Sequence, residues 1–205
     1  MLKTVRFPLI IAVILVAIAS LAGCSDTKTV QLSRDSVILA FGDSLTQGVG
    51  APAEQSYPAH LARALGVNVI NAGNSGETSA QGLTRIKALL EQYSPDLVII
   101  CYGGNDLLRR LPVNQLANNL EQMIQLSQAH GAQVLLVGVP KPAIFLDPVP
   151  VYSDLAKRYQ LAAELDILSD LLDDKGMKSD TIHLNSKGYQ AFAKALAAHI
   201  DITPN

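Results

Sequence analysis

The sequence has few cysteines, few charges and no tryptophan, and each shortage narrows what the protein can be. Two cysteines in 205 residues cannot build a disulfide framework or a cysteine-based metal site. The 16 lysines and arginines against 18 acidic residues give a net charge of -2 and form no basic tract, which argues against a nucleic-acid partner. Only 5% of the residues are aromatic, which disfavours a sugar-stacking platform. A small-molecule partner is therefore expected.

Apolar residues, in contrast, are plentiful. They make up 49% of the chain, which is enough for one substantial core, while 205 residues are too few for two comfortable domains. We therefore expect one folded domain with an N-terminal appendage.

The first 23 residues have the pattern of a targeting segment. Lys3 and Arg6 precede an apolar run over residues 9–21, which is too short and wrongly flanked for a mature membrane-spanning helix. The run ends in Leu-Ala-Gly-Cys24, which resembles the bacterial lipoprotein signal, where cleavage precedes the cysteine and the cysteine is lipidated. We predict a signal peptide over residues 1–23 and lipidation of Cys24. An uncleaved anchor and an ordinary secretory signal with an incidental cysteine are the alternatives.

The residues after Cys24 predict where the folded body lies. Ser25 follows the cysteine, and the absence of aspartate there resembles lipoproteins released to the outer membrane of diderm bacteria. Residues 24–35 predict a lipidated N-terminus and a short polar tether, because serine, aspartate, threonine and lysine dominate them. We expect a domain over residues 36–205 in the cell envelope, held at the membrane through Cys24 and facing the periplasm. The other cysteine, Cys101, lies in an apolar run and is expected in the core.

Short apolar runs alternate with helical patterns along the rest of the chain. The runs at 37–41, 67–70, 97–101 and 133–139, with a weaker one near 166–168, predict strands, and a helix is predicted over about 152–164. Strands that alternate with helices are typical of a parallel sheet covered on both faces. We predict an α/β fold, a three-layer α/β/α sandwich with a parallel sheet of about five strands. The proline-rich segment 140–150 is expected to be a loop that walls a binding cleft.

The first predicted strand ends at Gly42-Asp43-Ser44, where a glycine permits a sharp turn. Ligands of parallel sheets bind outside the carboxyl ends of the strands, so Ser44 lies where chemistry is expected. The first backbone N–H groups of the next helix would point toward whatever Ser44 attacks. The alternative is that Asp43 or Ser44 only caps this helix.

Three further segments carry groups that would complete a serine-based site. The second strand runs into a loop of small residues with Gly76, and the third ends before Asn105. Glycine lets the backbone approach a ligand closely, and an amide is an uncharged donor for a developing negative charge. Asp180 and His183 are three residues apart, so the imidazole could take the serine proton while the carboxylate fixes its tautomer. Each feature alone has a structural alternative, a tight turn or a helix cap.

Together these segments resemble the GDSL, or SGNH, hydrolase family of lipases, esterases and thioesterases. Gly-Asp-Ser44-Leu matches the first block of the family, Gly76 the second, Gly-Gly-Asn105-Asp the third and Asp180-x-x-His183 the last. The resemblance implies a flavodoxin-like fold with Ser44 as nucleophile, His183 as general base and Asp180 as its orienter. It implies an oxyanion hole made by the backbone N–H groups of Ser44 and Gly76 and the side-chain amide of Asn105. It implies no metal and no other cofactor.

The stretch from Val69-Ile-Asn-Ala to Gln81-Gly-Leu is similar to the bacterial acyl thioesterase, lysophospholipase and arylesterase branch. Two features depart from the pattern: Leu184 stands where many members carry proline, and residues 143–148 match no motif. The expected function is hydrolysis of short-to-medium acyl esters, thioesters or lysophospholipids through an acyl-enzyme. A deacetylase of cell-wall or polysaccharide sugars and a non-catalytic envelope lipoprotein are the alternatives. An apolar acyl groove is expected from Leu107, Leu108, Leu111, Ile144, Phe145 and Leu146.

Overall fold

The computed structural model describes residues 28–141 and 149–203, and a five-stranded sheet lies at its centre. The strand order is β3-β2-β4-β5-β6, and every neighbouring pair is parallel. The strands are β2 (Val37–Gly42), β3 (Asn68–Gly73), β4 (Leu97–Cys101), β5 (Gln133–Val137) and β6 (Ala162–Glu164). The α/β class and the parallel sheet of five strands are confirmed.

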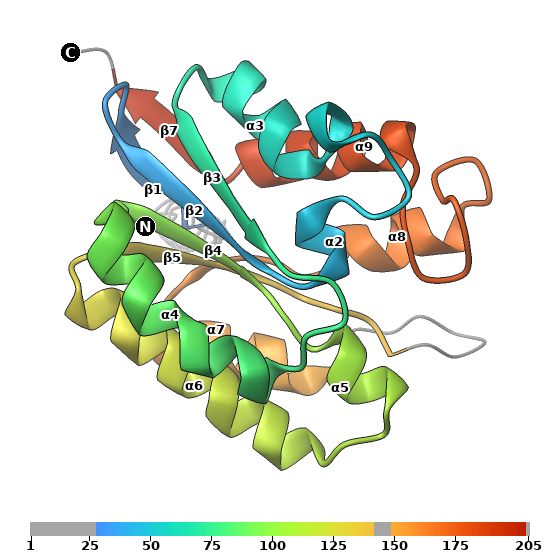
Figure 1. Cartoon of the computed structure of the whole chain (residues 1–205). Coiled ribbons are helices and arrows are strands. Elements are labelled where there is room, and N and C mark those ends of the chain that lie inside the picture. The colour runs from blue at the N-terminus through green and yellow to red at the C-terminus, as the bar shows by residue number, and fades with distance from the viewer. Residues whose placement is uncertain (1–27, 142–148, 204–205) are drawn as a thin grey trace, which may run out of the picture.

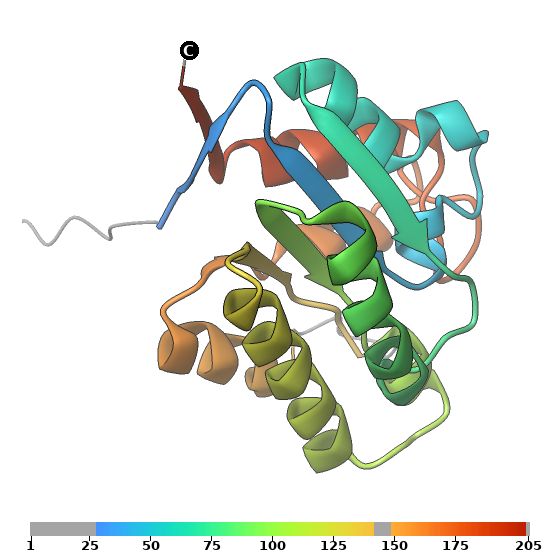
Figure 2. The same cartoon turned by 60° about the vertical axis from the view of Figure 1, so that its left-hand side comes forward.

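Helices cover both faces of this sheet, as Figure 1 and Figure 2 show. One face carries α4 (Ser79–Tyr93), α6 (Val113–Ala129) and α7 (Pro150–Tyr159). The other carries α3 (Tyr57–Leu65), α8 (Ile167–Asp173) and α9 (Ser186–Ala197). Three short segments lie in the connections: α2 (Ser44–Gln47), η2 (Ala53–Gln55) and α5 (Gly104–Leu108). This is the predicted three-layer sandwich.

The centre of the core is formed by β2 and β4. Every residue of β4 is buried, and so is β2 from Ile38 onward, because helices exclude water from both faces of the sheet. Cys101 ends β4 as a buried free cysteine, as expected from its apolar surroundings. Burial raises the pKa of its thiol well above the ordinary value, which disfavours the reactive thiolate.

The prediction of a polar tether over residues 24–35 is wrong for residues 30–33, which form a strand. Val30–Ser33 form strand β1, which pairs in parallel with β7 (Ile200–Thr203) in a second, two-stranded sheet. Val30 and Leu32 are buried, so this polar-looking segment contains an alternating pattern whose apolar side packs on the core. The folded domain therefore begins before residue 36. The predicted signal peptide and Cys24 lie outside the described residues.

The last strand of the central sheet is also placed differently from the prediction. The helix predicted over 152–164 ends at Tyr159, because Gln160 adopts a left-handed conformation with φ of 51°. Ala162–Glu164 then pair with β5, although alanine and glutamate favour helices, so the edge position decides their conformation. Residues 166–168, predicted as a strand, begin α8 instead. No helix among residues 28–141 and 149–203 is long and apolar enough to cross a membrane.

Candidate active site

Three neighbouring strands deliver the predicted groups to one edge of the sheet. Ser44 follows β2, Gly76 follows β3 and Asn105 follows β4, and all three line one pocket. Gly42 makes the turn before Ser44 possible, since a Cβ at that position would collide with the Cys101 carbonyl and the Thr46 side chain. The parallel register of the strands therefore brings distant segments together, as expected.

The serine is in contact with the predicted histidine, which is in contact with the predicted aspartate. His183 Nε2 lies 3.0 Å from Ser44 Oγ, and His183 Nδ1 lies 2.8 Å from Asp180 Oδ2. The other oxygen of Asp180 accepts the backbone N–H groups of Ile182 and His183, each at 2.8 Å. Partial burial acts to raise the pKa of Asp180, but these hydrogen bonds and the imidazole lower it below its ordinary value. The carboxylate can therefore hold the imidazole in the orientation that leaves Nε2 facing the serine.

The segment that carries Asp180 and His183 is closed by a hydrogen bond across it and leads directly into a capped helix, α9. Ser179 N–H donates to the His183 carbonyl at 2.9 Å, and Asn185 caps α9 by accepting from two backbone N–H groups, each at 3.0 Å. Leu184 is fully buried, so the apolar side chain found where many family members have proline fills the core. This departure leaves the positions of Asp180 and His183 intact.

Gly76 and Asn105, the predicted oxyanion donors besides Ser44, both line the pocket that contains the serine. Gly76 has φ of 80°, a conformation that residues with a Cβ rarely adopt. Asn105 Nδ2 donates to the Glu77 carbonyl at 2.9 Å and, with a longer distance of 3.2 Å, to Asp43 Oδ2. The amide is thereby oriented by two neighbours, and its weaker hydrogen bond is the one most easily exchanged for a ligand.

The sequence indicated Asp43 only as a helix cap, and the structure places it in the pocket as well. Its Oδ1 accepts the Leu45 N–H at 3.1 Å, which confirms the cap. Burial raises the pKa of Asp43 to about 6, and the Leu45 N–H and the Asn105 amide oppose this rise. Asp43 therefore contacts one of the predicted oxyanion donors, a role that the Gly-Asp-Ser spacing alone does not indicate.

Asp106 is a second residue whose role the sequence did not indicate. It is buried, and its two oxygens accept the Ser79 N–H at 2.8 Å and the Ser79 hydroxyl at 2.6 Å. These bonds join the start of α4 to α5, and so join the segment after Gly76 to the segment of Asn105. The only sequence signal was its place beside Asn105 in Gly-Gly-Asn-Asp.

The pocket is small and mainly apolar. Its volume is about 170 Å³, and its apolar lining comes from Leu45, Leu108, Val139, Pro140, Leu172 and Ile182. Of the residues expected to form an acyl groove, Leu108 lines the pocket, while Leu107 and Leu111 do not. Residues 144–146 and most of the proline-rich loop lie outside the described residues, but Pro140 contributes to the wall. Within the described ranges, no group of three or more His, Cys, Asp or Glu side chains could hold a metal ion.

Comparison with known proteins identifies the family. The model of the GDSL-like Lipase/Acylhydrolase family matches residues 40–191. Thioesterase 1/protease 1/lysophospholipase L1 of Escherichia coli K12 is 31% identical over 180 residues, which cover 84% of this chain and 86% of that protein. An arylesterase of Vibrio mimicus is 42% identical over 110 residues, which cover 51% of this chain. The match spans only 55% of that arylesterase, so the chain matches about half the length of this relative.

A solved structure agrees with the fold. The psychrotrophic esterase EstA from Pseudoalteromonas sp., in a structure inhibited by monoethylphosphonate, superposes with a TM-score of 0.73 and 27% identity. The superposition covers 80% of this chain and 96% of EstA. On the family model, the nearly full-length E. coli relative and this superposition, the chain belongs to the GDSL-like lipase/acylhydrolase family.

Proposed function

We propose that this protein is a serine hydrolase that cleaves carboxylic esters or thioesters through an acyl-enzyme. The observation that carries the proposal is the chain of contacts from Ser44 Oγ to His183 Nε2, at 3.0 Å, and from His183 Nδ1 to Asp180, at 2.8 Å. A serine hydroxyl needs a base within hydrogen-bond reach, and that base needs an orienting acceptor on its other nitrogen. Both requirements are met at the edge of one pocket.

The proposed reaction proceeds in two halves. Ser44 Oγ attacks the carbonyl carbon while His183 Nε2 takes the hydroxyl proton, and the carbonyl oxygen becomes an oxyanion. The N–H groups of Ser44, Gly76 and Asn105 stabilise this charge. The tetrahedral intermediate expels the alcohol or thiol, to which His183 returns the proton, and leaves an acyl group on Ser44. Water then attacks the acyl-enzyme with His183 again as base, which releases the acid and restores the serine.

The pocket supports an acyl substrate of short-to-medium length. A volume of about 170 Å³ with mostly aliphatic walls favours an apolar chain over a sugar ring. The related thioesterase/lysophospholipase and arylesterase agree with acyl esters and thioesters as the substrate class.

Replacement of the nucleophile tests this function. We expect Ser44→Ala to abolish hydrolysis of p-nitrophenyl esters and labelling by a fluorophosphonate, because both need the activated hydroxyl. Asn105→Ala should lower kcat by about 10²–10³, as for loss of one oxyanion donor. Wild-type activity in Ser44→Ala would refute the mechanism, and no labelling of the wild type would favour a non-catalytic protein. A series from acetyl to octanoyl esters tests the substrate class, since a strict acetyl preference would favour a deacetylase.

We further propose that the protein is attached to the outer membrane through a lipid on Cys24 and faces the periplasm. The Leu-Ala-Gly-Cys24 sequence supports lipidation, and the absence of aspartate after it supports the outer membrane. Since β1 begins at Val30, only residues 25–29 would separate the lipid from the folded domain. Incorporation of a labelled fatty acid into the wild type but not into Cys24→Ala is expected. Equal incorporation into both would disprove the lipid site.

A further inference from the structure

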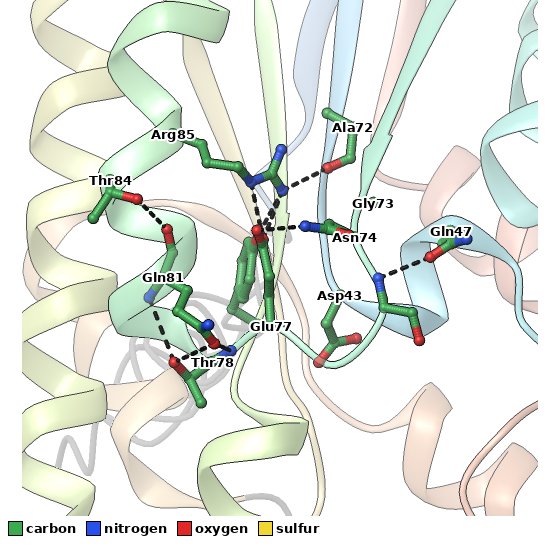
Figure 3. Close-up of polar contacts among 12 residues, drawn as sticks. Asp43, Gln47, Ala72, Gly73, Asn74, Glu77, Thr78, Gln81, Thr84 and Arg85 are labelled. Carbon is green, nitrogen blue, oxygen red and sulfur yellow. Dashed lines mark hydrogen bonds and ion pairs between the residues drawn. The ribbon is translucent and has the colours of Figure 1, made fainter.

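Beside the pocket lies a cluster of one carboxylate, one guanidinium and one phenol that takes no part in the proposed steps. Glu77 Oε2 accepts from Arg85 Nε at 3.0 Å, from Arg85 Nη2 at 2.8 Å and from the Tyr102 hydroxyl at 2.7 Å. Arg85 Nη2 also donates to the Ala72 carbonyl at 3.0 Å, and its guanidinium stands 5.1 Å from the centre of the Phe41 ring. Figure 3 shows Arg85 extending from α4 to Glu77 and Ala72. This set, which we call the Glu77 cluster, joins α4 to β2, to β3 and to Tyr102, the residue that directly follows β4.

Glu77 closes the turn that presents Gly76 to the pocket. Its N–H donates to the Asn74 carbonyl at 3.3 Å, and its Oε1 accepts from Asn74 Nδ2 at 2.7 Å, so backbone and side chain both bridge the turn. On the other side, the Ser75 N–H donates to Gln47 Oε1 at 2.8 Å. The Gly76 N–H has no acceptor among the described residues, so it is free for a ligand.

Glu77 also orients the side-chain amide of Asn105, another predicted oxyanion donor. The Glu77 carbonyl accepts from Asn105 Nδ2 at 2.9 Å, the shorter of the two hydrogen bonds of that amide. A shift of Glu77 would therefore move the Gly76 N–H and the Asn105 amide together. Its carboxylate is nearly buried and accepts two hydrogen bonds from Arg85 on α4 and one from Tyr102, which directly follows β4. Such a shift is therefore opposed by charge-assisted contacts.

We propose that Glu77, anchored by Arg85 and Tyr102, is a positioning residue that sets the geometry of the oxyanion hole. The inference rests on the proposed function, since it assigns Gly76 and Asn105 to that hole. Donors act best when they are fixed in advance at the place where charge develops, and small displacements cost rate. The cluster supplies this rigidity from outside the pocket without touching substrate.

Gly82 belongs to the same arrangement. A Cβ at this position would lie about 2.5 Å from Cζ of Tyr102, so glycine leaves the space in which the phenol reaches Glu77. This gives a physical reason for the Gln81-Gly-Leu stretch that the sequence singles out and that the reaction itself does not use.

The experiment compares this cluster with a matched one elsewhere in the protein. Glu121 Oε1 accepts from Arg158 Nη1 at 3.0 Å and from the Tyr159 hydroxyl at 2.6 Å, between α6 and α7. Glu77→Gln and Tyr102→Phe are the test variants, and Glu121→Gln and Tyr159→Phe are their controls. Ile86→Val, a core truncation in α4, controls for a general loss of stability near the site. Hydrolysis of p-nitrophenyl butyrate is measured well below the melting temperature of every variant, with Ser44→Ala as the blank.

We expect kcat to fall about tenfold in Glu77→Gln and a few-fold in Tyr102→Phe, with KM changed less than about twofold, because the donors are misplaced rather than removed. The two surface variants and Ile86→Val should keep the wild-type kcat. The inference is overturned alone if Ser44-dependent hydrolysis is present and the kcat of Glu77→Gln equals that of Glu121→Gln, or if only KM changes. It falls together with the proposed function if wild-type hydrolysis is no higher than that of Ser44→Ala.

Discussion

Two clusters among residues 28–141 and 149–203 combine the same three chemical groups, a carboxylate, a guanidinium and a phenol, and they differ in where they lie. The Glu77 cluster is packed between α4 and three strands, and the side chains of its ion pair are 10% exposed for Glu77 and 28% for Arg85. We call the other the Glu121 cluster; its ion pair joins α6 and α7 at the surface, with exposures of 26% for Glu121 and 61% for Arg158. In both, an arginine and a tyrosine hydroxyl donate to one glutamate oxygen.

Burial changes what the same three groups contribute to the structure. The Arg158 side chain is 61% exposed, so water competes for its hydrogen bonds, and such an exposed ion pair contributes little to stability and constrains little. The Arg85 guanidinium instead makes contacts to the Glu77 carboxylate, the Ala72 carbonyl and the Tyr102 hydroxyl, and few waters can replace them. The same set of hydrogen bonds is therefore more rigid when it is buried, and it can fix the position of the neighbouring turn at Gly76.

The largest difference between the two clusters is expected in the loss of stability when each glutamate is replaced by alanine. Glu77→Ala leaves a partly buried guanidinium and a buried phenol without their acceptor, so we expect the free energy of unfolding to fall by about 2–3 kcal/mol. Glu121→Ala exposes its partners to water and should change the free energy of unfolding within experimental error. Urea denaturation of both variants at pH 7 measures the difference. Equal losses would mean that the two clusters do not differ in the way proposed.

Acid should reduce the contribution of the Glu77 cluster to the free energy of unfolding, by less than the replacement of Glu77 with alanine does. Burial acts to raise the pKa of Glu77, but hydrogen bonds from Tyr102, Asn74 and Arg85 lower it below the ordinary value. A lowered folded-state pKa adds stability that is complete above the unfolded value, about 4.3, and is lost as the pH falls through the folded value. The stability difference between wild type and Glu77→Gln should thus be constant from pH 7 to 5 and shrink below about pH 4.

The pKa of Asp43 is shifted in the opposite direction to that of Glu77, so the experiment must compare two proteins that both contain Asp43. Its pKa is raised to about 6, so wild-type stability contains a contribution that decreases as the pH rises from about 4 to 6. Asp43 is present in both proteins, so its contribution cancels in the difference. A difference between wild type and Glu77→Gln that grows in acid would contradict the lowered pKa of Glu77.

The smallest expected effect on the stability differences is that of salt. The Debye length falls from about 10 Å at 0.1 M to 3 Å at 1 M, which screens exposed charges far more than buried ones. Any stability difference between wild type and Glu121→Gln should therefore disappear at 1 M NaCl, while the difference for Glu77→Gln should persist. Thermal melts at the two salt concentrations measure both, and an equal decline in the two clusters would show that Glu77 is as solvated as Glu121.

Much of the fold and the site could be predicted because the sequence patterns that indicate them are local. The apolar runs of β2 and β4 indicate strands buried on both faces, and the segments at Ser44, Gly76 and Asn105 directly follow strands. Parallel pairing then requires these groups to share one edge. The errors lie at the edges of the sheets, where β1 and β6 are short and their neighbours decide the pairing. The polar composition around Val30 predicted a tether, and residues 162–164 were predicted as the end of a helix, so neither strand was expected.

Local patterns along the chain are enough to predict the strand and helix alternation, the residue types of the candidate site and their order. Hydrophobic periodicity and turn chemistry act over a few residues, so these features can be read without coordinates. The packing of the layers, in contrast, brings Glu77 to Arg85 and Tyr102, brings Asp43 to Asn105, and buries one of two similar Glu–Arg–Tyr sets while it exposes the other. Those contacts depend on how layers pack between distant segments, and the burial that gives them strength exists only after packing.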